Sequence, residues 1–305
     1  MITPSSVPKA MEELYKQNLS KATHKTGRLF LFAGDQKIEH LNADFHGFAP
    51  EAADPEYMFV LAGQIRIGVF AAQLGLIARY GAAYRDVPFL VKMNGKTNLV
   101  GLDIDDPMSY PLSTVADVVR LRDEHKLKIY GVGMTVYLGS RYEGQMLAAA
   151  ARLVLDAHAQ GLLCVLWMYP RGKAVKNERS EAIIAGAAGV AHALGADFVK
   201  VNPPVNDQGE ALPELLLQAT MAAGMTRVIC SGGASVDPKE FLTTLHGQLH
   251  TGETRGVAIG RNIYQKSQLE AEAFCAAVAL LVYDNADLDV ALNKLTTWSR
   301  HDRHN

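Results

Sequence analysis

The sequence predicts an α/β fold, a (β/α)8 TIM barrel with an N-terminal helical extension and a C-terminal helix. From Arg28 onward, eight short apolar runs rich in β-branched residues alternate with segments of helical period, as in parallel βα units. No linker rich in Pro, Gly or Ser separates these units, and polar residues gather directly after the apolar runs, where barrel enzymes build their sites. A doubly wound sheet has the same alternation and is the alternative architecture.

The eight strands are expected where the apolar runs are almost continuous, because barrel strands are covered on both faces. In chain order they are residues 28–33, 65–71, 88–93, 128–134, 162–167, 197–201, 227–230 and 256–260. Helical periods between the later strands predict helices at 143–160, 180–194, 211–223 and 238–246.

Capping residues support these helices. Ser180 and Asp237 stand at two predicted N-termini, and Gly195 and Gly224 stand where a helix C-terminus favours a left-handed residue. Further helices are expected at the two ends of the chain, at residues 10–19, 268–282 and 286–297.

The chain length of 305 residues is compatible with one domain or two. Eight βα units fit into about 240 residues, close to the usual size of a barrel. We therefore expect an N-terminal extension at residues 1–27 and a single barrel catalytic domain at 28–305.

The composition argues against several classes of protein. Thirty Lys and Arg residues balance 32 Asp and Glu without a basic run, so we expect no nucleic-acid partner. The longest apolar stretches fall short of the roughly 20 residues of a membrane span, and the N-terminus lacks the apolar core of a signal peptide. Cys164, Cys230 and Cys275 are widely spaced in apolar segments, which indicates reduced core residues in a cytoplasmic protein.

Lys200 is the first candidate for chemistry because it lies within the apolar strand of GADFVKVNPP. If its side chain points into the barrel, desolvation lowers the pKa of the amine from its usual value of about 10.4. Nucleophilic lysine chemistry requires this shift, since only the free amine attacks a carbonyl. A lysine paired with a carboxylate at the strand end fits the same pattern.

The segment WMYPRG follows the fifth strand. Because side chains alternate along an extended chain, Trp167, Tyr169 and Arg171 should lie on one face. Tyr169 is a candidate general acid/base, and Arg171 is a candidate for bidentate binding of a phosphate or carboxylate. An aromatic lining with a surface arginine is the alternative.

Two later strands end in glycine-bearing turns, CSGGAS and AIGRNI. The loops after strands seven and eight of a barrel form a recurring phosphate site, where glycine lets backbone N–H groups approach the oxygens. The candidate residues of this site are Ser231, Gly232, Gly233, Gly260 and Arg261. Two such turns in consecutive units predict a phosphorylated ligand.

The segment AGDQKIEHLN follows the first strand. Asp35 is placed to hydrogen-bond a sugar hydroxyl or to position the amine, whereas Lys37, Glu39 and His40 are further polar groups that solvation alone would explain. The spacings of Glu39, His40 and His46 match no zinc site, so we expect neither a metal nor another cofactor.

Two further lysines occur in the segment KMNGKTNL, which overlaps the end of the third predicted strand and continues into the following loop. Lys92 lies in the strand and Lys96 in the loop. Either is a candidate for a second cation that helps to lower the pKa of Lys200, and Lys96 is alternatively a loop charge.

Taken in order, AGDQKIEHLN, WMYPRG, GADFVKVN, SGGAS and AIGRN resemble the archaeal-type class I fructose-bisphosphate aldolases. That group belongs to a wider set of Schiff-base barrels, which includes deoxyribose-phosphate aldolase and a thiolase acting on a phosphorylated pentane-dione. The similarity spans roughly residues 29–265 and is strongest at the lysine strand and the WxYPR stretch.

The resemblance implies reversible cleavage of fructose 1,6-bisphosphate to dihydroxyacetone phosphate and glyceraldehyde 3-phosphate, a step of glycolysis and gluconeogenesis. It implies that Lys200 forms the Schiff base, that Tyr169 transfers protons and that Trp167 packs beside the intermediate. It also matches Asp35 to the aspartate after the first strand, and the phosphate contacts to Ser231–Gly233, Gly260–Arg261 and Arg171. A homo-oligomer is expected, since members of the family are often decamers built from pentameric rings.

The chain departs from the family pattern after the first strand, where a DHG-type sequence is replaced by Gly34-Asp35-Gln36-Lys37. The acid is retained, so the substrate is less well defined by the resemblance than the reaction. Imine chemistry on another phosphorylated keto compound, as in the thiolase branch, and a phosphosugar-binding barrel without turnover are the alternatives.

Overall fold

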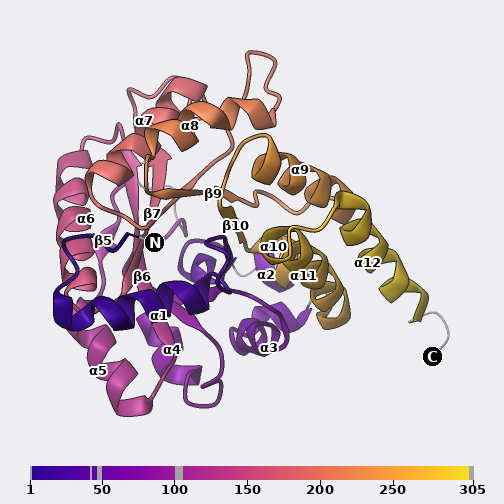
Figure 1. Cartoon of the computed structure of the whole chain (residues 1–305), viewed down its shortest axis with the longest axis horizontal. Helices are drawn as coiled ribbons and strands as arrows, with labels where there is room; N and C mark the ends of the chain where they lie inside the picture. The colour runs from indigo at the N-terminus through magenta and orange to yellow at the C-terminus, as the bar shows by residue number, and fades with distance from the viewer. Residues whose placement is uncertain (1, 42, 47–49, 100–105, 302–305) are drawn as a thin grey trace.

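Eight parallel strands close into a barrel in the computed structural model, which describes residues 2–41, 43–46, 50–99 and 106–301 (Figure 1). The strand order is β1-β10-β9-β8-β7-β6-β3-β2. The predicted (β/α)8 barrel is therefore confirmed, and the doubly wound alternative is wrong.

The barrel strands are β1 (Leu29–Ala33), β2 (Val69–Gln73), β3 (Phe89–Lys92), β6 (Ile129–Leu138), β7 (Leu163–Pro170), β8 (Phe198–Val201), β9 (Arg227–Ser231) and β10 (Gly256–Ile259). A separate antiparallel pair consists of β4 (Asn94–Gly95) and β5 (Tyr110–Pro111). All barrel strands except the second begin within one residue of the predicted start.

The second strand was expected at residues 65–71 and instead begins at Val69. Ile65 caps the end of helix α3 (Glu56–Gln64), and Gly68 sits where a Cβ atom would lie 2.0 Å from the carbonyl oxygen of Ala22. The predicted run thus covers a partly buried turn as well as a strand, and hydrophobicity alone does not separate the two.

The helices that surround the barrel are α4 (Leu74–Tyr80), α5 (Val115–His125), α6 (Glu143–His158), α7 (Glu181–Ala193), α8 (Leu217–Ala222), α9 (Pro238–His250), α10 (Arg261–Tyr264), α11 (Gln268–Tyr283) and α12 (Leu288–His301). Helices α1 (Glu12–Ala22) and α2 (Ala43–His46) lie nearer the N-terminus, and 3-10 turns form at Lys9–Met11, Asp35–Ile38, Pro50–Ala53 and Pro213–Leu216.

The predicted caps are largely present. Asp237 accepts hydrogen bonds from the N–H groups of Lys239 and Glu240, and Gly195 and Gly224 have φ values of 85° and 55°. Ser180 occupies the N-cap of α7, but its side chain makes no capping hydrogen bond.

The apolar residues form an outer layer between strands and helices and an inner cluster within the barrel. The inner cluster includes Leu90 of β3 and Phe198 of β8. Because side chains alternate along a strand, Lys92 and Lys200 follow these residues on the inward face. Cys164, Cys230 and Cys275 are buried and free, as predicted.

Helix α1 covers the N-terminal opening of the barrel. Tyr15 and Leu19 are buried in the inner cluster, and the side-chain amide of Asn18 donates a 2.8 Å hydrogen bond to the carbonyl of Gly161, just before β7. Figure 1 shows α1 crossing beside β6. The helix of the predicted extension therefore forms the floor of the barrel. Among the described residues, no helix is both long enough and apolar enough to span a membrane.

Candidate functional site

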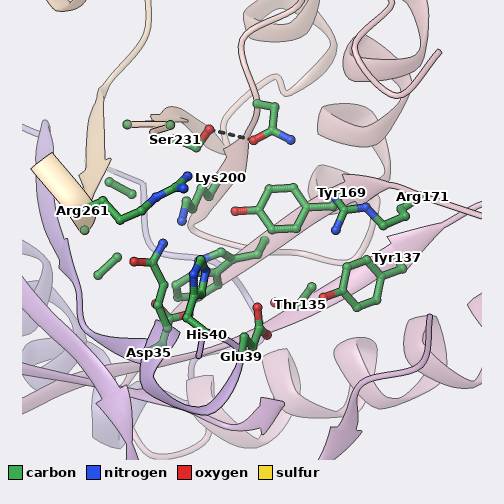
Figure 2. A pocket seen from close by; sticks show the side chains of 18 residues that line it. Asp35, Glu39, His40, Thr135, Tyr137, Tyr169, Arg171, Lys200, Ser231 and Arg261 are labelled. Atoms are coloured by element: carbon green, nitrogen blue, oxygen red, sulfur yellow. Dashed lines mark hydrogen bonds between the residues drawn. The ribbon is translucent and has the colours of Figure 1, made fainter. Parts of the chain in front are cut away.

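A cavity of about 200 Å³ opens at the C-terminal ends of the strands. Every residue predicted for the site lines it: Asp35, Trp167, Tyr169, Arg171, Lys200, Ser231, Gly232, Gly233, Gly260 and Arg261. In Figure 2, Ser231 and Arg261 lie at one end and Tyr137 and Arg171 at the other, with Lys200 and Tyr169 between them. The structure thus brings together groups that are spread along the sequence from Asp35 to Arg261.

Lys200 projects into this cavity from β8. Its side chain is almost wholly buried, with 6% of the residue exposed. The Nζ atom lies 5.7 Å from the centre of the Trp167 ring and 5.9 Å from that of Tyr169. An amine held against two aromatic rings has little water to solvate its charged form.

Burial lowers the pKa of Lys200, and the nearby Arg261 guanidinium lowers it further. The carboxylates of Asp35 and Glu39 act in the opposite direction. The net shift is downward, so a larger share of Lys200 is a free amine at neutral pH than for an exposed lysine. This is the state that attacks a carbonyl carbon.

Trp167, Tyr169 and Arg171 line one side of the cavity, as their alternation along the chain predicted. Gly133, on the neighbouring strand β6, makes room for the indole, because a Cβ there would lie 2.2 Å from Cζ3 of Trp167. Burial raises the pKa of the Tyr169 phenol, and Asp35 and Glu39 raise it further. Tyr169 therefore rests as a neutral phenol that can donate a proton.

Arg171 stands at the rim of the cavity. Its Nε donates to both carboxylate oxygens of Glu178, at 3.2 and 3.3 Å, and its guanidinium lies 5.8 Å from the centre of the Tyr137 ring. The arginine is thus already paired, and an anionic ligand at this end must share it with Glu178.

Thr135 and Tyr137 also line the cavity but were not predicted. Strand β6 continues four residues beyond the expected end, to Leu138, and sets Thr135 beside Trp167 and Tyr137 beside Tyr169. The signal was present in the sequence, because Thr-Val-Tyr-Leu continues the β-branched and aromatic run of this strand.

At the end of β9, the three predicted residues Ser231, Gly232 and Gly233 make different contacts. Gly232 donates its N–H to the carbonyl of Ala258 at 2.8 Å, so this donor is occupied. Gly233 has a left-handed φ of 66°, and its N–H has no acceptor within the described ranges. The Ser231 hydroxyl donates to Oδ1 of Asn202 at 2.7 Å. Asn202 is a further lining residue, and its position two residues after Lys200 could have identified it.

The turn after β10 brings the backbone of Gly260 and the side chain of Arg261 to the same end of the cavity as Ser231. Gly260 must lack a side chain, since a Cβ would lie 2.9 Å from the carbonyl oxygen of Ala33 and 2.5 Å from Oε1 of Gln36. Arg261 follows it at the start of α10, and its buried Nε has no hydrogen-bond partner in the part of the chain described. A cation with an unused donor favours an anionic group at this end.

Asp35 is held on a 3-10 turn directly after β1 and is 7% exposed. Its Oδ2 lies 3.6 Å from Nζ of Lys92, whereas its buried Oδ1 has no partner among the described residues. Glu39 and His40 also reach the cavity, and His40 pairs with Asp44 at 2.8 Å. One carboxylate oxygen of Asp35 is therefore buried without a hydrogen-bond partner among the described residues.

The remaining lysines lie outside the cavity lining. Lys37 donates to the carbonyl of Ala53 at 2.9 Å, and Lys96 donates to the side chain of Asn98. The neighbouring cation that lowers the pKa of Lys200 is Arg261. No group of three His, Cys, Asp or Glu residues that could hold a metal occurs in the described ranges.

Comparison with known proteins agrees with this geometry. The family model described as DeoC/LacD family aldolase matches residues 29–266 of this chain. The fructose-bisphosphate aldolase/6-deoxy-5-ketofructose 1-phosphate synthase of Methanocaldococcus jannaschii is 47% identical over 291 residues, which cover 95% of this chain and 92% of the relative.

Two solved structures share the fold and the sequence. A fructose-bisphosphate aldolase from Slackia heliotrinireducens has a TM-score of 0.93 at 48% identity, covering 97% of this chain and 94% of that chain. An archaeal fructose-1,6-bisphosphate aldolase with its catalytic Lys covalently bound to the carbinolamine intermediate has a TM-score of 0.75 at 33% identity, covering 88% and 99%. The chain therefore belongs to the DeoC/LacD family of aldolases, as its sequence motifs indicated, and is a carbon–carbon lyase.

Proposed function

We propose that the protein is a class I aldolase that cleaves fructose 1,6-bisphosphate reversibly through an imine on Lys200. The observation that carries the proposal is the buried Lys200 amine, 5.9 Å from the ring of the neutral Tyr169 phenol. At one end of the same cavity lies Arg261, whose Nε has no hydrogen-bond partner among the described residues. The relatives named as fructose-bisphosphate aldolases support the same substrate.

The reaction begins when the free amine of Lys200 attacks C2 of the ketose. Tyr169 then donates its proton to the carbinolamine hydroxyl, which leaves as water and gives the iminium ion. The phenolate that remains accepts the proton of the C4 hydroxyl as the C3–C4 bond breaks. The electron pair of that bond moves into the enamine, because the iminium nitrogen accepts electrons readily.

Tyr169, again neutral, returns its proton to C3 of the enamine after the aldehyde has formed. Water then hydrolyses the imine and frees dihydroxyacetone phosphate and the Lys200 amine. The raised pKa of the resting phenol suits this sequence, because Tyr169 acts first as an acid.

The two ends of the cavity have different roles in this proposal. Ser231, Gly233 and Arg261 bind the phosphate of the ketone half, where the N–H of Gly233 and the Nε–H of Arg261 have no partner among the described residues. Arg171 binds at the aldehyde end. Asp35 accepts a hydrogen bond from a substrate hydroxyl through its carboxylate, which lines the cavity.

Reduction of the imine tests the proposal directly. Incubation with dihydroxyacetone phosphate and borohydride should give a stable adduct on Lys200, located by peptide mass spectrometry. Lys200→Met should give no adduct and no turnover, whereas Lys128→Met, at an exposed ion pair on the far end of β6, should behave as wild type. Tight binding of the ketose without an adduct would instead favour a barrel that binds phosphosugars without turnover.

The ion pair of Arg171 with Glu178 favours a second candidate substrate. Because Glu178 partly neutralises Arg171, this end of the cavity attracts a second phosphate less strongly. The relative from Methanocaldococcus jannaschii is also named as a 6-deoxy-5-ketofructose 1-phosphate synthase. The same imine would then join dihydroxyacetone phosphate to an aldehyde or keto compound without a phosphate. Values of kcat/KM across phosphorylated and unphosphorylated acceptors, with acyl acceptors for the thiolase branch, decide between these substrates.

The homo-oligomer, with a decamer as the expected form, and the cytoplasmic location stay predictions. Sedimentation velocity on the purified chain measures the first, and fractionation of the source cells measures the second.

A further inference from the structure

Lys92 is a buried charge that the proposed mechanism does not use. It is the last residue of β3, is 1% exposed and does not line the cavity. Burying an ammonium group is costly unless it is paired and hydrogen-bonded. Its contacts should therefore indicate why the chain retains a cation at this position.

The Nζ atom of Lys92 has two polar neighbours. It lies 3.6 Å from Oδ2 of Asp35 and donates a 3.3 Å hydrogen bond to the carbonyl of Asn94. It also lies 5.4 Å from the centre of the Trp167 ring, the same indole that Lys200 contacts. The ammonium thus stands behind two residues that face the ligand.

Asn94 is itself fixed in place. Its wholly buried side chain accepts a hydrogen bond from the N–H of Thr135 and donates to the carbonyls of Thr135 and Ser109. These contacts anchor the carbonyl that receives Lys92. The position of the ammonium is therefore set by β6 and by the loop after β3, not by the ligand.

This arrangement restrains the carboxylate of Asp35. Lys92 engages Oδ2, whereas the buried Oδ1 has no partner among the described residues, and the residue itself lines the cavity. An ion pair to one oxygen restricts rotation of the carboxylate, so the other oxygen keeps its direction.

We propose that Lys92 is a positioning residue of the imine reaction, which holds the Asp35 carboxylate by Oδ2 and so fixes its orientation toward a hydroxyl of the substrate. The inference rests on the proposed function. It assigns Lys92 a different role from that of a second cation acting on Lys200, because its ion pair is with Asp35. Lys92 acts through Asp35 and makes no contact with the ligand.

A double-mutant cycle tests this inference. Lys92→Met keeps the length of the side chain and removes the positive charge, and Asp35→Asn removes the negative charge of the ion pair. We expect Lys92→Met to lower kcat by between about tenfold and a hundredfold, as for a mispositioned catalytic group, with a smaller change in KM. In the Asp35→Asn background the same substitution should change kcat less than about twofold.

Two measurements separate this role from a purely structural one. The adduct formed on Lys200 with dihydroxyacetone phosphate and borohydride should persist in Lys92→Met, because the amine itself is untouched. The melting temperature shows whether each variant is folded. If Lys92→Met does not fold, Lys92→Arg retains the charge with altered geometry, and the cycle is repeated with it.

The outcomes distinguish the two proposals. A wild-type protein without an adduct contradicts the proposed function. An adduct in the wild type together with unchanged kcat in Lys92→Met, or with effects of Lys92→Met and Asp35→Asn that multiply, overturns the role of Lys92. Lys128→Met serves as the matched control, since it removes a lysine from an exposed pair with Asp86.

Discussion

Tyr15 and Asp197 are joined by a 2.5 Å hydrogen bond at the base of the barrel, although 182 positions separate them in the sequence. Oδ2 of the same carboxylate accepts the backbone N–H of Cys164 at 2.7 Å and lies 3.1 Å from Nε2 of His158. The hydrogen bond fastens α1 to the residue that precedes β8. Lys200 lies three residues further along, so this strand is anchored at the end opposite the cavity.

Loss of this contact should cost stability and leave the chemistry intact. Tyr15→Phe removes the hydroxyl and leaves a buried carboxylate oxygen without its donor, so the free energy of unfolding should fall by about 1–3 kcal/mol. Urea denaturation measures the change. Tyr110→Phe, at a residue that is 60% exposed, should change it by less than about 0.5 kcal/mol. A Tyr15→Phe variant with wild-type stability and reduced kcat would contradict this division.

The pH dependence of imine formation should respond in opposite directions to two substitutions. The pKa of Lys200 is lowered by burial and by Arg261, and it is raised by Asp35. The free amine forms as pH rises through this lowered pKa, so the rate of adduct formation should increase with pH. Arg261→Met removes a repelling cation and should move the midpoint to higher pH, whereas Asp35→Asn removes an anion and should move it to lower pH.

Dihydroxyacetone is the suitable probe for this measurement, because it carries no phosphate and does not depend on the anion contacts of Arg261. Arg152→Met on the exposed side of α6 is the control and should leave the midpoint unchanged. Shifts of the same sign for Arg261→Met and Asp35→Asn would show that their charges do not act on Lys200 as described.

Gly133 should be intolerant of even one methyl group. In Gly133→Ala the new Cβ would lie 2.2 Å from Trp167 and 2.5 Å from the carbonyl oxygen of Val165, so β6 and β7 must separate or the indole must move. We expect a loss of about 1–3 kcal/mol in the free energy of unfolding, together with reduced kcat. Gly144→Ala, whose Cβ would meet open space on helix α6, should raise stability by up to about 1 kcal/mol. Equal effects of the two substitutions in urea denaturation would contradict the argument.

Tyr169→Phe should separate imine formation from carbon–carbon cleavage. The indole, the lysine and the anion contacts remain, so the borohydride adduct should still form, although more slowly. Turnover should fall by about 10²- to 10⁴-fold, as for the loss of a general acid/base. A stopped assay of product formation measures cleavage, and the amount of borohydride adduct measures imine formation. Tyr130→Phe, at the floor end of β6, is the control, and a Tyr169→Phe enzyme with normal kcat would remove the tyrosine from the mechanism.

Patterns of period two predicted much of the site. The alternation of Trp167, Tyr169 and Arg171, and the position of Lys200 within an apolar strand, were sufficient to place these side chains at the cavity. The two glycine turns in consecutive units predicted the other end of the cavity, because close approach of the backbone requires glycine.

Contacts between distant segments could not be predicted in this way. The partner of Lys92 is Asp35, on the 3-10 turn after β1, and the occupied N–H of Gly232 depends on its register with Ala258. The start of β2 depends on the approach of α1 to Gly68, which no local pattern records. Such features arise from barrel closure, whereas periodicity reports only the face on which each residue lies.

The closed floor of the barrel bears on the order of events in catalysis. With α1 filling the N-terminal opening, substrate and products use the mouth between the strand-end loops. In the proposed reaction the ketone half is tethered to Lys200 while the aldehyde half is free, so we expect the aldehyde to depart first and dihydroxyacetone phosphate last. Kinetics of this order make dihydroxyacetone phosphate a competitive inhibitor of cleavage and the aldehyde a noncompetitive one.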